Sequence, residues 1–165
     1  MKTIIVPLSV ILTFSCAPII SHANNAEVSE KNKKVELLPR PYSESDLLGR
    51  WLYVDETLDL KFMKVLNLKE EGVAELDAMT LTKDGNVQQL HQVSEWAFDK
   101  ESNVFSYKVI SSVLKRNGEI VNNEFFQVNP TDSLVKIVKK GNSIFLVLTR
   151  GDGTIEHYKS ANKIF

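Results

Sequence analysis

The side chains best suited to acid–base or metal chemistry are few in this chain of 165 residues, which holds three histidines and one cysteine. His91 and His157 each lie in a stretch that alternates like a β-strand. Neither belongs to a metal-binding pattern, a Gly-x-Ser-x-Gly elbow, a phosphate-binding glycine loop or a His-Glu-x-x-His helix. We interpret both as ordinary strand histidines.

Acidic residues are plentiful, but Glu70, Glu71, Asp84 and Asp152 adjoin turns, where they solvate loops. Catalysis by paired carboxylates needs two carboxyl groups that face each other, and the linear sequence gives no sign of such a pair. We therefore expect a protein that is not an enzyme, with no catalytic residue, no metal site and no cofactor.

Aromatic and apolar residues form the second set of candidates. They alternate with polar residues, and a barrel of about eight strands is just wide enough for one small ligand or for side chains alone. We expect these residues to point inward and to line a ligand site: Phe62, Leu66, Trp96, Phe98, Phe105, Tyr107, Val109 and Phe126. The alternative is that the same bulky side chains fill the interior.

Regular turn signals such as Asp84-Gly85 and Asn117-Gly118 place these residues on strands, because Asp-Gly and Asn-Gly favour tight hairpins. Between two of these signals, Phe105, Tyr107, Val109, Ser111 and Val113 are expected to share one face. The spacing predicts nine strands, near residues 50–56, 61–70, 73–82, 87–98, 104–115, 120–129, 134–140, 143–150 and 154–159.

Strands joined one after another by short hairpins predict an all-β fold, since no stretch after Gly49 is long enough for a crossover helix. Closure of the sheet satisfies the hydrogen bonds of its edges. The expected fold is an up-and-down antiparallel β-barrel of about 8–9 strands. A short helical turn is expected before it, capped by Ser43 with Asp46 at the capping-box position.

The tetrapeptide Leu48-Gly49-Arg50-Trp51 stands at the entrance to the first predicted strand. We expect Gly49 to let the backbone pass close under the indole, and Trp51 to plug one end of the barrel. In this position the motif resembles the opening motif of the lipocalins and of smaller bacterial lipocalin-like domains of the calycin group.

The resemblance implies an eight-stranded or slightly larger barrel, closed at one end by Trp51 together with Gly49. It also implies that an arginine from a late strand stacks on the indole, and Arg150 is the matching residue. Such a cation–π contact is worth roughly 0.5–2 kcal/mol. The Thr-Asp-Tyr motif, the long helix and the disulfide of larger lipocalins are missing, so no particular ligand is implied.

The N-terminus predicts export. Lys2, an apolar run and the small residues of Ser21-His22-Ala23 predict a signal peptide over residues 1–23, which places the mature chain in the periplasm or outside the cell. A membrane anchor is an alternative, although the apolar run is shorter than the roughly 20 residues that cross a bilayer. Lipidation at Cys16 is another, although bulky Phe14 occupies a position that prefers a small side chain. Cleavage near Ala23 leaves no cysteine, hence no disulfide.

Residues 24–42 are polar and then proline-flanked, which predicts a flexible leader before a barrel domain over residues 43–165.

Without Lys2, the expected mature chain has 19 basic side chains and 21 acidic ones, which gives a formal net charge of −2. The basic pairs are scattered beside turn signals, so we expect no nucleic acid as partner and no transmembrane span in the mature chain.

Two functions follow. The first is an exported, non-enzymatic binding protein that holds a small apolar or lipid-like ligand inside the barrel, driven by burial of apolar area at about 25 cal/mol per Å². The alternative is an envelope protein–protein interaction or inhibitor module with a filled barrel. Joint exposure of Ile110, Leu114, Val121 and Phe125 would favour this alternative.

Overall fold

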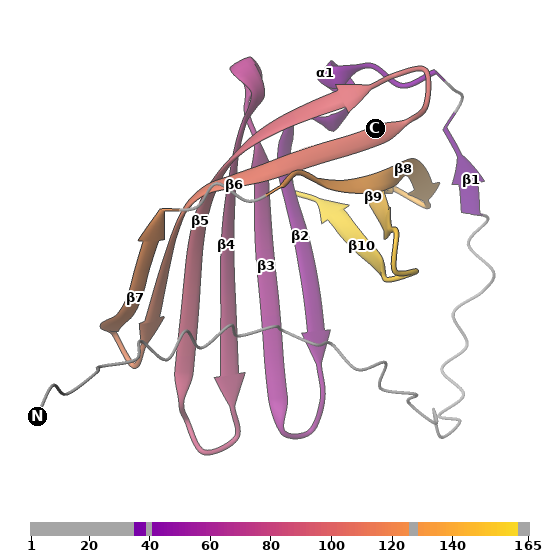
Figure 1. Ribbon diagram of the computed structural model, residues 1–165. Helices are drawn as coiled ribbons and strands as arrows, with labels where there is room; N and C mark the ends of the chain where they lie inside the picture. The colour runs from indigo at the N-terminus through magenta and orange to yellow at the C-terminus, as the bar shows by residue number, and fades with distance from the viewer. Residues whose placement is uncertain (1–34, 39–40, 126–128, 162–165) are drawn as a thin grey trace, which may run out of the picture. The chain divides into compact units, whose positions relative to one another are not determined.

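The computed structural model describes residues 35–38, 41–125 and 129–161. Eight antiparallel strands close a barrel in the order β2-β3-β4-β5-β6-β8-β9-β10, and β10 pairs with β2 (Figure 1). The elements are β1 (Val35–Leu37), α1 (Glu44–Leu47), β2 (Gly49–Glu56), β3 (Leu60–Leu68), a 3-10 turn (Glu70–Gly72), β4 (Val73–Thr82), β5 (Val87–Asp99), β6 (Val104–Arg116), β7 (Glu119–Phe125), β8 (Thr131–Lys140), β9 (Ser143–Arg150) and β10 (Ile155–Ser160). The predicted fold class is confirmed.

The nine predicted strands correspond to β2–β10, and the predicted helical turn is α1, with the capping box between Ser43 and Asp46 in place. One strand was not anticipated. Residues 35–37, inside the expected leader, form β1 and pair with β8, with Leu37 opposite Val138. Three residues are too few to show a period in the sequence. Only their pairing with β8 in the structure identifies them as a strand. Phe126, Cys16 and the expected signal peptide lie outside the described residues.

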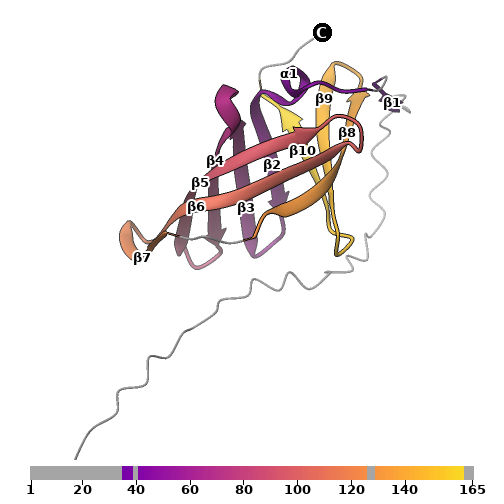
Figure 2. The ribbon, with the colours of Figure 1, turned by 45° about the horizontal axis from the view of Figure 1, so that its top comes forward.

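The barrel closes over only part of β6. Its first half, Val104 to Tyr107, pairs with β8, whereas its second half pairs with β7. Figure 2 shows β7 beyond the point where β8 joins β6. The second half of β6 therefore extends beyond the closed part of the barrel and carries β7.

A β-bulge interrupts the alternation of β6. Val109 is opposite Ser94, but Ser111 is opposite Val93, so Ile110 is an extra residue on β6. A bulge of this kind changes which side chains face inward. The prediction that Ser111 and Val113 share the face of Phe105 is therefore wrong, since the register beyond the bulge places Leu114 on that face, opposite Leu90.

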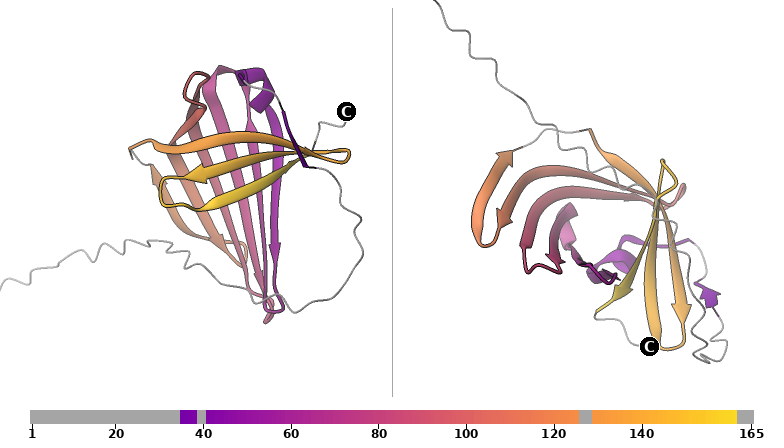
Figure 3. Two further views of the ribbon diagram at one scale, coloured as in Figure 1. Left: turned by 90° about the vertical axis from the view of Figure 1, so that its right-hand side faces the viewer. Right: turned by 90° about the horizontal axis from the view of Figure 1, so that it is seen from below.

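The closed end of the barrel is packed with apolar side chains. Strands β8, β9 and β10 lie across the curved sheet of β2–β6 (Figure 3). Between the two layers is a buried cluster that includes Trp51, Leu66, Leu68, Trp96, Phe98, Phe105, Val135, Ile137, Leu146 and Leu148. Tyr42, which precedes α1, joins this core, and its hydroxyl accepts a hydrogen bond of 3.2 Å from the backbone N–H of Ile137.

Trp51 is 1% exposed, and its indole Nε1 donates a hydrogen bond of 2.6 Å to the carbonyl oxygen of Leu47. The expected reason for Gly49 is wrong: a Cβ at this position would meet no atom of the described residues within 4 Å. Gly49 instead adopts φ +115°, which side chains rarely allow. The close approach occurs at Gly72, where a Cβ would lie 2.9 Å from the carbonyl oxygen of Trp96.

Among the described residues, no helix has the length and apolar character needed to cross a membrane.

Candidate functional site

The candidate site lies on the inner face of the barrel, the face that carries Trp51, just beyond the packed core. Cross-strand pairing runs from Tyr53 on β2 to Lys64 on β3, Ala78 on β4, Leu90 on β5 and Leu114 on β6. Directly opposite residues share a face, so these five side chains form one row across the sheet. This row marks the boundary of the apolar core, because Tyr53, Lys64, Leu90 and Leu114 are half-buried and Lys64 is charged.

Glu156 is surrounded by three side chains that bond to it, those of Lys64, Arg150 and Tyr158. We call these four residues the Glu156 cluster. Lys64 Nζ lies 2.5 Å from Glu156 Oε1, and Arg150 Nη2 lies 3.2 Å from Glu156 Oε2. The hydroxyl of Tyr158 donates a third hydrogen bond, of 3.0 Å, to Oε2. The Glu156 cluster therefore joins β3, β9 and β10 across the inside of the barrel.

The cations around Glu156 keep it ionised. Burial acts to raise the pKa of Glu156, but the charges of Lys64 and Arg150 and the hydrogen bonds that it accepts outweigh burial, so the pKa lies below its usual value. Burial also acts to lower the pKa of Arg150, and the carboxylate of Glu156 outweighs it, so this pKa is raised. Burial, followed by the charge of Glu156, raises the pKa of Tyr158 far above its ordinary value, which keeps the phenol protonated as a donor.

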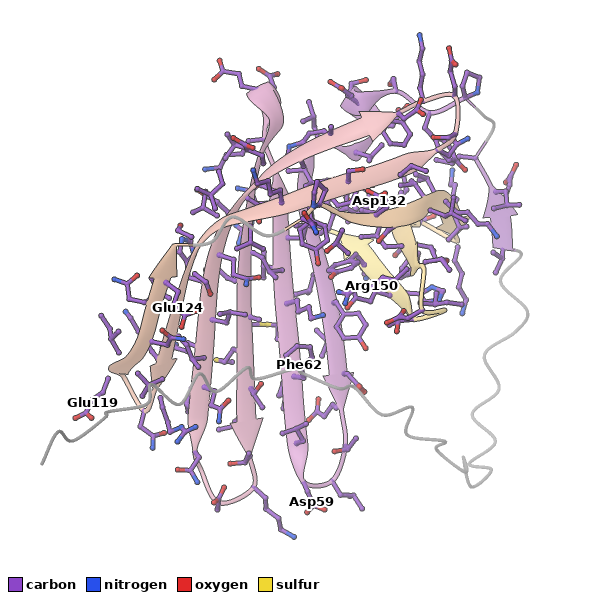
Figure 4. The ribbon with its side chains drawn as sticks, viewed as in Figure 1. Asp59, Phe62, Glu119, Glu124, Asp132 and Arg150 are labelled. Carbon is purple, nitrogen blue, oxygen red and sulfur yellow. The ribbon has the colours of Figure 1, made fainter. Side chains whose placement is uncertain are left out.

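Aromatic rings surround the cation of Lys64. Its Nζ lies 5.6 Å from the ring centroid of Tyr53 and 5.2 Å from that of Phe62. Tyr53 also packs edge-on against Phe62, with ring centroids 6.2 Å apart, and against Tyr158 at 5.8 Å. Figure 4 labels Phe62 on β3 and Arg150 near the end of β9. Ring faces attract cations, so the two rings help to hold the ammonium group in this position.

The Glu156 cluster is not sealed from water. The side chain of Glu156 is 9% exposed, that of Lys64 16% and that of Arg150 33%. Two cations contact the carboxylate of Glu156, and the exposed carboxylate of Asp152 also acts on Arg150 through its charge. An arginine and a lysine with this exposure can donate hydrogen bonds to an oxyanion that approaches from the open side.

The residues predicted to line a ligand site divide into two groups. Leu66, Trp96, Phe98 and Phe105 are buried and help to fill the closed end. Phe62, Tyr107 and Val109 are half-buried on the inner face nearer the Glu156 cluster, and Phe126 lies outside the described residues. Trp96 is fixed by its indole N–H, which donates hydrogen bonds of 3.0 Å to the carbonyl oxygens of Lys69 and Val73.

Sequence reasoning missed Lys64, Glu156, Tyr53 and Tyr158. The available signal was period-2 alternation: Lys64 lies between Phe62 and Leu66, two positions from each, and Glu156 lies two positions before Tyr158. A charged residue in phase with a buried set points toward the interior. Its partner cannot be found in this way, because Lys64 and Glu156 are 92 residues apart.

Arg150 has a different partner from the one that the lipocalin resemblance implies. The register places Trp51 opposite Ser160, at the end of β10, whereas Arg150 bonds Glu156, near the start of β10. Arg150 and Trp51 therefore lie toward opposite ends of this strand. The indole of Trp51 is instead bonded to Leu47.

The two histidines of the described residues, His91 and His157, lie outside the barrel interior. His91 is exposed, and its Nδ1 lies 2.8 Å from Asp77 Oδ1. It borders an outer-face groove of about 430 Å³ that crosses β3–β6, lined in part by Met63, Val65 and Met79. His157 is exposed on β10. In the part of the chain that the structure describes, no three His, Cys, Asp or Glu side chains are grouped so that they could hold a metal ion.

The apolar set that would favour a protein partner is not exposed as a group. Ile110 and Val121 are exposed, but Leu114 is half-buried on the inner face. The side chain of Phe125 lies outside the described part of the chain.

Comparisons with protein-family models, with curated proteins and with solved structures give no match for this chain.

Proposed function

We propose that this chain is an exported, non-enzymatic binding protein of the lipocalin-like type, which holds a small lipid-like ligand inside its barrel. The observation that carries the proposal is that the inner face of the barrel changes along its length from packed apolar side chains to charged side chains. The core is solid at the Trp51 end, whereas Lys64 and Arg150 point inward and still reach solvent. A filled interior would bury these groups or replace them with apolar side chains.

The inner face beyond the core offers apolar area as well as charge. Phe62, Leu90 and Leu114 are each half-buried there. A ligand that buries about 300 Å² of apolar surface against such side chains gains about 7 kcal/mol before the cost of association. That gain offsets an association cost of about 4–15 kcal/mol in part or in full.

The lipocalin-like assignment rests on three features together: the closed eight-stranded antiparallel barrel, the capped helical turn α1 before it, and a first-strand tryptophan buried at one end. Residues 1–23 are proposed as the signal peptide, with the mature protein in the periplasm or secreted.

Native mass spectrometry of the protein purified from its own envelope fraction tests this function. We expect a bound species of lipid size that dissociates when the collision energy is raised. The protein denatured and refolded in lipid-free buffer is the control, and it should show only the apo mass. An apo mass for the envelope-purified sample contradicts the proposal.

One observation favours the alternative, an envelope protein–protein interaction or inhibitor module. Ile120 and Val121, on the β7 extension, are 61% and 51% exposed. If the envelope-purified protein carries no small molecule but is cross-linked to another envelope protein through β7, this alternative replaces the first. A double variant, Ile120→Ser with Val121→Ser, should then abolish the cross-link and leave the fold intact.

A further inference from the structure

We propose that the outer face of the barrel binds a soft monovalent cation, Cu⁺. The ligands are the thioether sulfurs of Met63 and Met79 and the Nε2 atom of His91. Asp77 positions the imidazole of His91. These residues lie on the face of the sheet opposite to the Glu156 cluster, so the inference goes beyond the proposed function and is independent of it.

The two methionines of the described residues lie directly opposite each other, Met63 on β3 and Met79 on β4. The sequence holds three methionines, and the third is Met1. Opposite residues of antiparallel strands have Cβ atoms about 4.5–5.5 Å apart. Two long, flexible thioether side chains at this spacing can therefore place both sulfur atoms on one cation.

The imidazole of His91 leans toward the strand of Met79. Its Nδ1 lies 2.8 Å from Oδ1 of Asp77, which is the residue opposite His91 on β4. Asp77 comes two positions before Met79, so the two side chains share a face and are about 7 Å apart along the strand. The contact with Asp77 thus brings the ring of His91 over β4, on the side of the methionine pair.

The bond to Asp77 also decides which ring nitrogen of His91 is available. A carboxylate only accepts hydrogen bonds, so in the neutral imidazole Nδ1 carries the hydrogen and Nε2 keeps its lone pair. Nε2 makes no hydrogen bond to the described residues. A carboxylate bonded to the other ring nitrogen is the usual partner of a metal-binding histidine, and it fixes the orientation of the ring.

One groove on the outer face brings the three ligands together. It has a volume of about 430 Å³, crosses β3–β6, and is lined by Met63, Met79 and His91 as well as by Asp77. This volume exceeds that of a single ion, so the side chains have room to turn toward it.

Charge does not select the cation at this groove. Besides His91, the ionisable residues that line it are Asp77 and Lys115, which have opposite charges. Glu75 and His91 also interact through charge, but Glu75 is paired with Lys69, whose Nζ lies 2.5 Å from its Oε1. The donor atoms therefore decide which cation binds, and thioether sulfur favours Cu⁺ over hard cations, which prefer oxygen.

The sequence predicted no metal site, because the signals considered there were patterns of histidine, cysteine and carboxylates. Met63 and Met79 lie on the two strands of one hairpin, and His91 lies on the next strand. Only the register of β3, β4 and β5 brings the three residues to neighbouring positions on one face.

A purely structural role for the methionine pair makes a different prediction. If Met63 and Met79 only cover the outer face, leucine should replace either of them without consequence, because this exchange conserves the volume of the side chain. The affinity for a soft cation is therefore a readout that a packing role would not change.

Isothermal titration calorimetry with Ag⁺, a redox-inert probe for Cu⁺ sites, tests the proposal on the protein purified from its envelope fraction. The buffer is free of chloride, and N-ethylmaleimide blocks the thiol of Cys16 in any chain that retains it. We expect one Ag⁺ per chain. Anaerobic competition with bicinchoninate then measures Cu⁺ itself. Zn²⁺ should bind at least about tenfold more weakly than Ag⁺, because thioethers are soft ligands and only one imidazole is present in the groove.

The variants are Met63→Leu, Met79→Leu and His91→Gln, each of which should lower the affinity for Ag⁺ at least about tenfold. Asp77→Asn should lower it by about tenfold, as the loss of a partner behind a metal-binding histidine does. His157→Gln is the matched control, since His157 is an exposed histidine on β10, and it should leave the affinity unchanged.

Methyl NMR of protein labelled with ¹³C at the methionine methyl groups identifies the sulfur donors without any substitution. We expect the signals of Met63 and Met79 to move when one equivalent of Ag⁺ is added. This measurement uses the unmodified protein, so it stands even where a variant fails to fold.

No binding of Ag⁺ and Cu⁺ overturns the proposal, and so does binding that both leucine variants retain unchanged. Methionine methyl signals that stay in place while Ag⁺ binds also overturn it. Zn²⁺ binding as tight as that of Ag⁺ overturns the assignment to a soft cation. None of these outcomes bears on a ligand inside the barrel, which would contact the other face of the sheet.

Discussion

Trp51 and Leu47 are joined by a hydrogen bond of 2.6 Å between the indole Nε1 and the carbonyl oxygen at the end of α1. This bond connects the helical turn to the first barrel strand at the packed end. Leu47 is itself fully buried in the core, so the turn both covers the barrel end and fixes the orientation of the indole. The first prediction concerns this pair.

Trp51→Ala should lower the free energy of unfolding by about 3–5 kcal/mol, because it empties a buried aromatic site. Trp51→Phe should cost less, about 1–3 kcal/mol, chiefly because it leaves the buried carbonyl of Leu47 without its donor. Urea unfolding followed by circular dichroism measures both. Unchanged unfolding of Trp51→Ala would show that the indole does not hold this end of the barrel.

Gly49→Ala should destabilise the fold by about 1–3 kcal/mol, although the space beside Gly49 is open, because its φ of +115° is strained for a side chain. Gly151→Ala is the matched control. It also has open space, and its φ lies outside the strained range, so its effect should stay within about 1 kcal/mol. Equal effects in thermal unfolding would contradict a conformational role for Gly49.

Glu156→Gln should destabilise the protein by about 3–5 kcal/mol at pH 7, because it leaves Lys64 and Arg150 without their carboxylate. The pKa of Glu156 is lower in the folded state than its unperturbed value of 4.5. Its contribution is therefore complete above about pH 4.5 and is lost as the pH falls through the folded pKa. The difference in unfolding free energy between wild type and variant, measured from pH 7 down to pH 3, should be constant above about pH 4.5 and should narrow below it, by at most about 1.4 kcal/mol per pH unit.

Glu75→Gln is the control for the Glu156 experiment. Its ion pair with Lys69 is more exposed, with 32% of the Glu75 side chain and 45% of the Lys69 side chain accessible. Such pairs contribute at most about 1 kcal/mol. A loss at Glu75 as large as that at Glu156 would refute the special role of the buried carboxylate.

Asn103→Gly should leave the stability within about 1 kcal/mol of wild type or raise it. Asn103 adopts φ +57°, which glycine accepts freely, and its buried Oδ1 has no hydrogen-bond partner among the described residues. Asn103→Ala should cost about 1–2 kcal/mol, because alanine keeps the left-handed strain and loses the local tolerance of asparagine. Differential scanning calorimetry measures the stability of both variants. An Asn103→Ala variant that is more stable than Asn103→Gly would contradict this prediction.

Local chemistry decided the strands. Asn117-Gly118 and Asp84-Gly85 encode hairpins within two residues, and alternation of Trp96 with Phe98 shows which face is buried, so β2–β10 were predictable from neighbours in the chain. The capping box of Ser43 and Asp46 is equally local and was predicted correctly.

Pairing between distant strands decided the rest. The bulge at Ile110 exists only relative to β5, and it reverses which later residues of β6 point inward. β1 becomes a strand only because the edge of β8 is there to pair with it.

The amino-acid sequence by itself determined the succession of hairpins and the closed all-β fold, since both follow from turn residues and a period of two. Only the tertiary structure decided that Lys64, Arg150 and Glu156 meet, and that Arg150 bonds Glu156 and does not stack on Trp51. The tertiary structure also decided where the packed core ends. The physical reason is that ion pairs and packing depend on distance in space, and barrel closure brings together β3 and β10, which the chain separates by 92 residues at the Lys64–Glu156 contact.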